Sequence, residues 1–124
     1  MEKKDLALNK KILEYLVTIG IQPKLSGFEY LRLAIKLVMQ NKNYLANITK
    51  MLYPEIAELS GTRTACVERS IRHAIEVSYN CNGLLGLNDI YGFVIYNGKR
   101  KPTNGELIAL LTEKLEIEMT KSGT

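Results

Sequence analysis

Apolar residues recur at helical spacing along most of the chain. Between residues 6 and 19 they return every three or four positions, with lysines and a glutamate between them, which is the pattern of an amphipathic helix. Gly20 and Pro23 follow and predict its end. The same reasoning predicts five more helices: residues 27–40, 44–52, 54–59, 65–79 and 103–119.

Polar and small residues mark the ends of several predicted helices. Ser26 precedes the second helix and Glu29 follows three residues later, which is the capping-box pattern and predicts Ser26 as the N-cap. Thr64 is the predicted N-cap of residues 65–79. Gly61 predicts the end of the short helix before it.

Residues 80–102 lack a helical period and are rich in glycine and asparagine. Residues 91–96 have some strand character, but no second apolar run follows Asn97-Gly98 to complete a hairpin, so this segment is predicted to be an ordered irregular loop. The expected fold is therefore all-α, a bundle-like single domain of six helices over residues 1–124. Residues 1–5 and 121–124 are expected to be flexible.

Residues 54–79 match the layout of a helix-turn-helix. Ala57 is a small residue that lets the second helix pack closely, Gly61 forms the turn, and Val67 packs the second helix back on the first. Ser60 and Thr62 are polar where many such motifs are apolar, so an ordinary helical corner is the alternative.

A helical wheel divides residues 65–79 into two faces. The apolar face holds Val67, Ile71, Ala74, Ile75 and Ser78. The opposite face holds Ala65, Arg69, Arg72, His73 and Glu76, with Glu68 on its flank. Arginine makes bidentate contacts with guanine, and glutamate accepts a hydrogen bond from cytosine N4, so this face suits a DNA major groove. The alternative is a solvated face on which Glu68 and Arg72 pair one turn apart.

The amino-acid composition of the chain limits the functions that we expect of it. Lys and Arg number 17 against 13 Asp and Glu, a net charge of +4 that permits a polyanionic partner without requiring one. With two cysteines and one histidine the chain has too few ligands for a structural zinc site, and no catalytic or nucleotide-binding motif is present. We therefore expect neither an enzyme nor a metal or other cofactor. The short apolar runs and charged start predict no membrane span or secretory signal, hence a cytoplasmic protein.

The segment VERSIRHAIEV, residues 67–77, resembles a family pattern close to V-E-R-x-I-R-H-A-I-E-V. That pattern belongs to the C-terminal effector domain of the stage-zero sporulation response regulator, the master regulator of endospore formation. The resemblance continues in three further blocks: residues 27–35, 48–57 and 101–109.

The resemblance implies a six-helix transcription regulator that binds double-stranded DNA. Residues 65–79 would be the recognition helix, in the major groove of a box close to TGTCGAA. Glu68, Arg69 and Arg72 stand at the family's base-reading positions. Candidates for contacts with the DNA backbone are Arg63, Thr64, His73, Lys99, Arg100 and Lys101. The alternative for Lys99, Arg100 and Lys101 is a solvated charge cluster in a loop that does not contact DNA.

Two departures from the family bear on function. Ala65 and Cys66 stand where the family has Ser-Arg, which removes a hydroxyl and a cation where phosphates would dock; Arg63 is close enough to compensate. Family members also carry a receiver domain with a phosphoacceptor aspartate, which this sequence lacks. It is either the effector part of a longer protein or a stand-alone relative, and its charged N-terminal start favours the second.

Without a receiver domain we expect a monomer in solution that pairs head-to-tail on tandem DNA sites, with RNA polymerase as a further candidate partner. The alternative function is an interaction module that has lost DNA binding and modulates a full-length relative or RNA polymerase. A small hydrolase is a distant third possibility that no set of residues supports.

Overall fold

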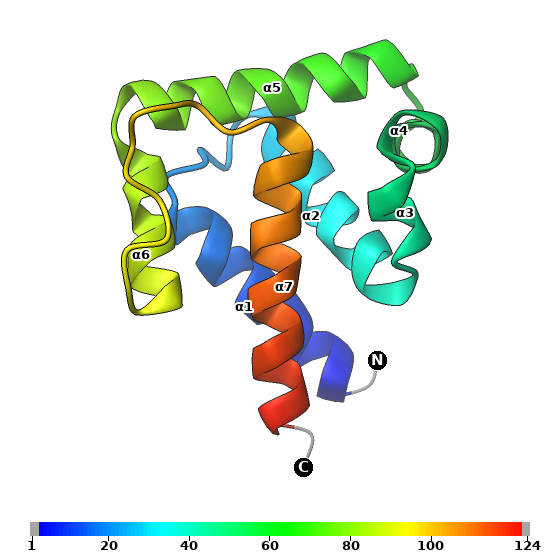
Figure 1. Cartoon of the computed structure of the whole chain (residues 1–124). Helices are drawn as coiled ribbons and strands as arrows, with labels where there is room; N and C mark the ends of the chain where they lie inside the picture. The colour runs from blue at the N-terminus through cyan, green and yellow to red at the C-terminus, as the bar shows by residue number, and fades with distance from the viewer. Residues whose placement is uncertain (1–2, 123–124) are drawn as a thin grey trace.

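The computed structural model describes residues 3–122, which form seven α-helices (Figure 1). In chain order these are α1 (Lys3–Thr18), α2 (Ser26–Gln40), α3 (Asn43–Ala46), α4 (Tyr53–Ser60), α5 (Thr64–Asn80), α6 (Gly86–Tyr91) and α7 (Asn104–Ser122). A π-helical turn, Ile48–Leu52, precedes α4, and a 3-10 turn, Gly83–Leu85, precedes α6. No strand occurs among the described residues, which confirms the all-α prediction, but the number of helices is seven rather than six.

The core is built around α2, which packs against α1, α4, α5 and α7. Its buried side chains include Phe28, Leu31, Ala34, Ile35, Leu37 and Val38. Full burial of a leucine or isoleucine stabilises the folded state by about 1.5–3 kcal/mol, so this central helix is a main source of stability.

Both predicted N-caps are wrong by one residue. Ser26 and Thr64 are the first helical residues of α2 and α5, and Leu25 and Arg63 occupy the cap positions without a side-chain cap bond. A cap residue needs an extended backbone, which Leu25 and Arg63 have with ψ angles of 143° and 150°. Glu29 bonds to an arginine one turn further along α2 instead of closing a capping box.

The predicted helix over residues 44–52 is broken at Asn47, whose φ and ψ are −135° and 58°. After the break, Leu52 N donates a hydrogen bond to Asn47 O at 3.2 Å, across five residues, which makes the turn π-helical. The turn runs directly into α4 and leaves Leu52 fully buried.

The segment predicted as an irregular loop contains α6. Gly86, its first residue, lies so close to the end of α1 that a Cβ atom there would be 2.1 Å from Thr18 O. Gly83 approaches the same chain segment, with 3.0 Å between an added Cβ and Ile19 O. These glycines therefore allow close packing against α1 rather than marking a loop.

The segment between α6 and α7, residues 92–103, is irregular as predicted, and we call it the basic loop after Lys99, Arg100 and Lys101. Asn88 of α6 fastens its first half. Its Oδ1 accepts hydrogen bonds from Ile95 N at 2.8 Å and Tyr96 N at 3.0 Å. The loop runs along the outside of the fold to the start of α7 (Figure 1).

The helices α4 and α5 form the predicted helix-turn-helix layout. Gly61 ends α4 with a φ of 67°, in the left-handed region, and Thr62 N donates to Ala57 O at 2.9 Å. Ala57 is 5% exposed and Val67 is fully buried, so both occupy the packing roles expected of them.

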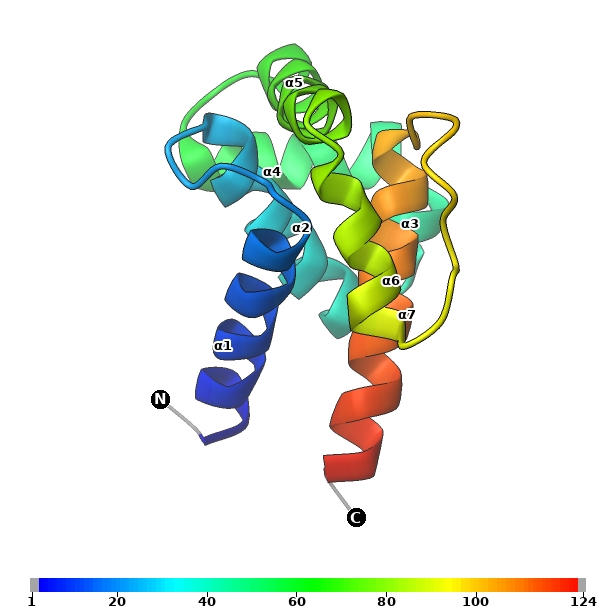
Figure 2. The ribbon, with the colours of Figure 1, turned by 90° about the vertical axis from the view of Figure 1, so that its left-hand side faces the viewer.

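The helix α5 lies across one end of the molecule (Figure 1). The start of α1 and the end of α7 both lie at the opposite end of the molecule (Figure 2). None of the described helices combines the length and hydropathy that crossing a bilayer requires.

Candidate nucleic-acid interface

The two faces of α5 differ in burial as the helical wheel predicts. The buried face comprises Val67, Ile71, Ala74, Ile75 and Ser78. The exposed face comprises Ala65, Arg69, Arg72, His73 and Glu76. The structure thus confirms that two arginines, one turn apart, face solvent on a helix whose other side is held in the core.

The inner side of α5 is held by close contacts with α2 and the end of α1. A Cβ atom on Gly27 would lie 2.3 Å from Ser70 O and 2.6 Å from Ala74 Cβ, so the two helices meet almost backbone to backbone. Ser78 is 1% exposed and donates its hydroxyl hydrogen bond to the carbonyl oxygen of Ile19. Both contacts restrict movement of α5 relative to the core.

A buried asparagine connects the start of α7 to α5. Asn104, 8% exposed, donates from Nδ2 to Tyr53 Oη at 3.0 Å and to the Glu68 backbone oxygen at 3.2 Å. Burial raises the pKa of the Tyr53 hydroxyl. Because Tyr53 begins α4, one side chain ties both helices of the helix-turn-helix to α7. Neither Asn104 nor Tyr53 was among the predicted site residues.

The charged groups of the exposed face are partly paired. Arg72 Nη1 lies 3.1 Å from Glu68 Oε2, so the pair expected of a solvated helix face is present. Arg72 is exposed and Glu68 is partly exposed, and such a pair on a helix surface contributes only about 0.3–0.5 kcal/mol. Within residues 3–122, Arg63 and Arg69 make no ion pair. Little free energy therefore opposes a new partner for any of these four groups.

A shallow hollow opens at the surface beside the contact between α5 and the start of α2. It is lined by Leu25, Ser26, Gly27, Arg69, Ser70 and His73. The first turn of α2, which borders the hollow, has no side-chain cap. The structure therefore brings Arg69 and His73 together beside the start of α2, which was not among the predicted site residues.

Arg63 is the cation nearest the start of α5 and occupies its N-cap position, and Thr64 is the first helical residue. The next two residues are Ala65, which is exposed, and Cys66, which is half-buried. Hydrogen bonds with the Thr62 and Ser70 hydroxyls lower the pKa of the Cys66 thiol. The described residues hold no group of three or more His, Cys, Asp or Glu side chains that would bind a metal ion.

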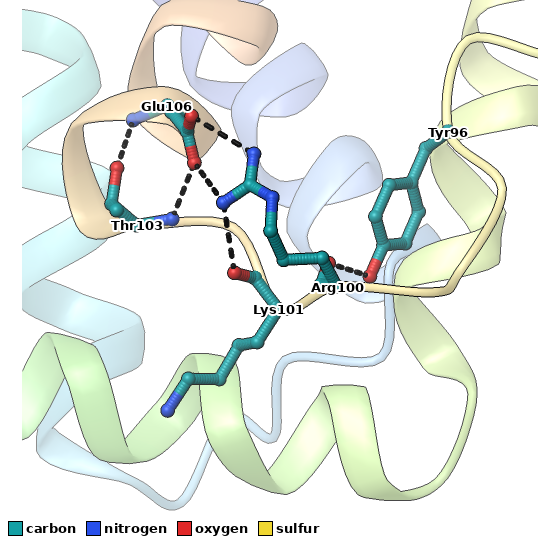
Figure 3. A network of polar contacts seen from close by, with 5 residues as sticks. All are labelled: Tyr96, Arg100, Lys101, Thr103 and Glu106. Atoms are coloured by element: carbon teal, nitrogen blue, oxygen red, sulfur yellow. Dashed lines mark hydrogen bonds and ion pairs between the residues drawn. The ribbon is translucent and has the colours of Figure 1, made fainter.

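Within the basic loop, Arg100 is engaged with Glu106 of α7 (Figure 3). Its Nη1 and Nη2 donate to the two carboxylate oxygens, each at 3.1 Å. Thr103 N donates to Glu106 Oε1 at 2.8 Å and Glu106 N donates to Thr103 Oγ1 at 3.1 Å, which is a capping box. The bonds from Arg100, then those from Thr103, lower the pKa of Glu106 to about 2.

The remaining cations of the basic loop lie beside α5. Lys101 Nζ is 3.9 Å from Glu76 Oε2, and the Tyr79 hydroxyl donates to Lys99 O at 3.3 Å. A groove of about 460 Å³ opens between α5, the basic loop and the turn before α4. Its lining includes Thr49, Tyr53, Glu68, Arg72, Lys101 and Asn104. Of the predicted site residues, Glu68 and Arg72 of α5 and Lys101 of the basic loop line this groove, whereas Arg69 and His73 line the hollow beside α2.

Comparison with known families agrees with this geometry. Residues 12–115 match the family described as "Sporulation initiation factor Spo0A C terminal". The match covers α2 to α6 completely, together with parts of α1 and α7. Domains of this family bind DNA and regulate transcription in sporulation. An all-helical fold, a helix-turn-helix with an exposed arginine face and a match over most of the chain lead to one conclusion: the chain belongs to the Spo0A C-terminal family.

Proposed function

We propose that α5 is the recognition helix of a sequence-specific regulator and enters the major groove of a DNA box close to TGTCGAA. The exposed face of α5 carries this proposal, because a major groove about 12 Å wide admits one helix. Arg69 and Arg72 each suit a bidentate contact with guanine, and Glu68 suits cytosine N4. The weak Glu68–Arg72 pair separates at little cost when bases replace it.

Phosphate contacts on both sides of the groove complete the interface. The candidates are Arg63, Thr64, His73, Lys99, Arg100 and Lys101. They lie at the start of α5, beside the start of α2 and along the basic loop, so they border α5 over its whole length. Such contacts fix the orientation of the helix without reading sequence.

Base readout is tested by fluorescence anisotropy with a TGTCGAA duplex and a scrambled duplex. Arg69→Ala or Arg72→Ala should weaken binding to the box by about 1–3 kcal/mol and relax base preference at one position. Lys4→Ala is the matched control, because Lys4 is an exposed cation in the first turn of α1, and α1 begins at the end of the molecule opposite α5 (Figure 2). If both arginine variants keep full discrimination with an unchanged circular dichroism spectrum, α5 is not the recognition helix.

The phosphate contacts are tested by titrating salt. Four to six of them imply a slope of about −4 to −5 in a plot of log affinity against log salt concentration. Lys99→Ala should weaken binding to all sequences about equally. A flat salt response would contradict groove binding.

A second candidate function is an interaction module that contacts RNA polymerase or a full-length relative. Two large apolar side chains of the basic loop favour it, since Phe93 and Val94 are 60% and 76% exposed. Ala65 and Cys66 at the start of α5 favour it as well, because they supply no cation for a phosphate. A domain that binds purified RNA polymerase but no duplex would establish this function in place of the first.

The domain should be mainly monomeric and pair head-to-tail only on adjacent DNA sites, where tethering raises the effective concentration. Light scattering should then report about 14.0 kDa without DNA. A stable dimer at micromolar concentration would contradict this expectation.

A further inference from the structure

The three cations of the basic loop have different surroundings. Arg100 is paired through both Nη atoms with the Glu106 carboxylate. Lys101 extends away from that pair (Figure 3) and lies 3.9 Å from Glu76 on α5. Lys99 makes no ion pair within the described part of the chain. Among these three cations Lys99 thus has no carboxylate partner in the described part of the chain, and Lys101 has only the long contact with Glu76.

The second half of the basic loop has no regular secondary structure, so its shape depends on individual bonds. Lys99 N donates to Asn97 Oδ1 at 2.9 Å, and the Tyr96 hydroxyl donates to Arg100 O at 2.7 Å. Both bonds are internal to the loop, and the Tyr79 hydroxyl of α5 donates one further bond to Lys99 O at 3.3 Å. The bonds of Arg100 to Glu106 join this half of the loop to α7, whose start is itself fixed to α5 through Asn104.

We propose that Arg100, unlike the other phosphate candidates named above, serves DNA binding as a positioning residue that acts through Glu106 and not as a phosphate ligand. The Arg100–Glu106 pair holds the basic loop against α7 so that Lys99 and Lys101 stand beside α5 and reach the flanking phosphates. Glu106, although an acid, thereby supports affinity for DNA. This inference rests on the DNA-binding function proposed above.

The proposal predicts an effect opposite in sign to that of simple electrostatics. A carboxylate near DNA repels phosphates, so its removal would strengthen binding if it did nothing else. If Glu106 positions the loop, its removal weakens binding, because the two lysines lose their fixed place. The direction of the change separates the two roles.

Glu106→Gln is the test variant, because glutamine at this position keeps the capping box and removes the charge that pairs with Arg100. Glu113→Gln is the matched control; it makes the same change on an exposed residue of α7, further from α5. Glu106→Gln should weaken duplex binding about three- to tenfold and reduce the magnitude of the salt slope by about 1. Unchanged or tighter binding overturns the proposal, and so does an equal loss in Glu113→Gln.

Arg100→Gln, alone and combined with Glu106→Gln, separates positioning from direct contact. If Arg100 acts through Glu106, the double variant should bind about as weakly as either single variant. If Arg100 contacts a phosphate directly, the two changes have independent effects and the proposal fails.

Hydrogen exchange of the free protein gives a readout that needs no DNA. The Lys99 amide should exchange faster in Glu106→Gln than in the wild type, while amides in α2 stay unchanged. Unchanged exchange at Lys99 overturns the positioning role even if DNA binds. If the wild type binds no duplex, the function proposed above fails and this inference fails with it; if the wild type binds and only the sign of the Glu106 effect is wrong, this inference alone fails.

Discussion

Replacing Gly27 with alanine measures how tightly α2 and α5 are packed. The added Cβ would lie 2.3 Å from Ser70 O and 2.6 Å from Ala74 Cβ, whereas unstrained contacts between such atoms need about 3.5 Å. The first neighbour is a backbone atom and the second a Cβ, so no change of rotamer relieves the overlap. The two helices must move apart by about 1 Å.

The expected loss of stability follows from two opposing effects. Overpacking of a core contact costs about 1–3 kcal/mol, and a clash with backbone belongs at the upper end of that range. Alanine returns up to about 1 kcal/mol through its higher helix propensity. The net loss should be about 2 kcal/mol, which lowers the Tm of a domain of this size by roughly 6–12 °C.

Urea unfolding followed by circular dichroism checks this value, with Gly105→Ala as the matched control. A Cβ at Gly105 would meet Ile48 Cδ1 at 2.8 Å, the movable end of a side chain, so its free energy of unfolding should change by less than about 1 kcal/mol. If Gly27→Ala is as stable as the wild type, the close approach of α2 and α5 is wrong. One of the two contacts that restrict the movement of α5 would then be absent.

Three further predictions concern single contacts. Ser78→Ala removes the buried hydrogen bond to Ile19 O and should lower the free energy of unfolding by about 1–3 kcal/mol in urea; no change would show that the bond is absent. Gly61→Ala has open space around it but a φ of 67°, so strain alone should cost about 1–2 kcal/mol in the same assay, and Gly61→Asn should lose less. The hydrogen bond from Tyr15 lowers the pKa of Glu118 below its ordinary 4.5, so this carboxylate stabilises the fold above that pH and the stabilisation disappears as pH falls through the lowered pKa. The Tm difference between wild type and Glu118→Gln should therefore shrink below pH 4.5, and a difference independent of pH would refute the assignment.

The helices that bury a long apolar stripe were predictable from sequence, and α5 is the clearest example. Its buried stripe runs from Val67 to Ser78, about three turns, so burial and exposure follow from geometry alone. The six residues of α6 are too few to show a helical period of apolar positions, and a glycine such as Gly86 at its start is typical of a loop. Contact with Thr18 of α1 is what makes glycine necessary there, and that contact exists only in the folded chain.

In the site too, features local to one helix were predictable and contacts between distant segments were not. That Arg69 and Arg72 face outward is a local property of a helix, so the sequence predicted it. Asn104 bonds to Glu68 across 36 residues, and no pattern within either helix indicates that bond. The capping role of Glu106 could have been predicted, because Thr103 and Glu106 have the spacing of a capping box. Its pairing with Arg100 could not, because that contact depends on how the basic loop returns to α7.

The start of α1 and the end of α7 lie at the end of the molecule away from α5 (Figure 2). A flexible linker from residue 122 of one copy to residue 3 of a second copy would therefore leave both arginine faces uncovered. The length of such a linker sets the distance over which the two faces act together, and their joint affinity is highest when that length matches the span. A series of covalently joined pairs with different linkers would thus act as a molecular ruler for the spacing of neighbouring DNA boxes.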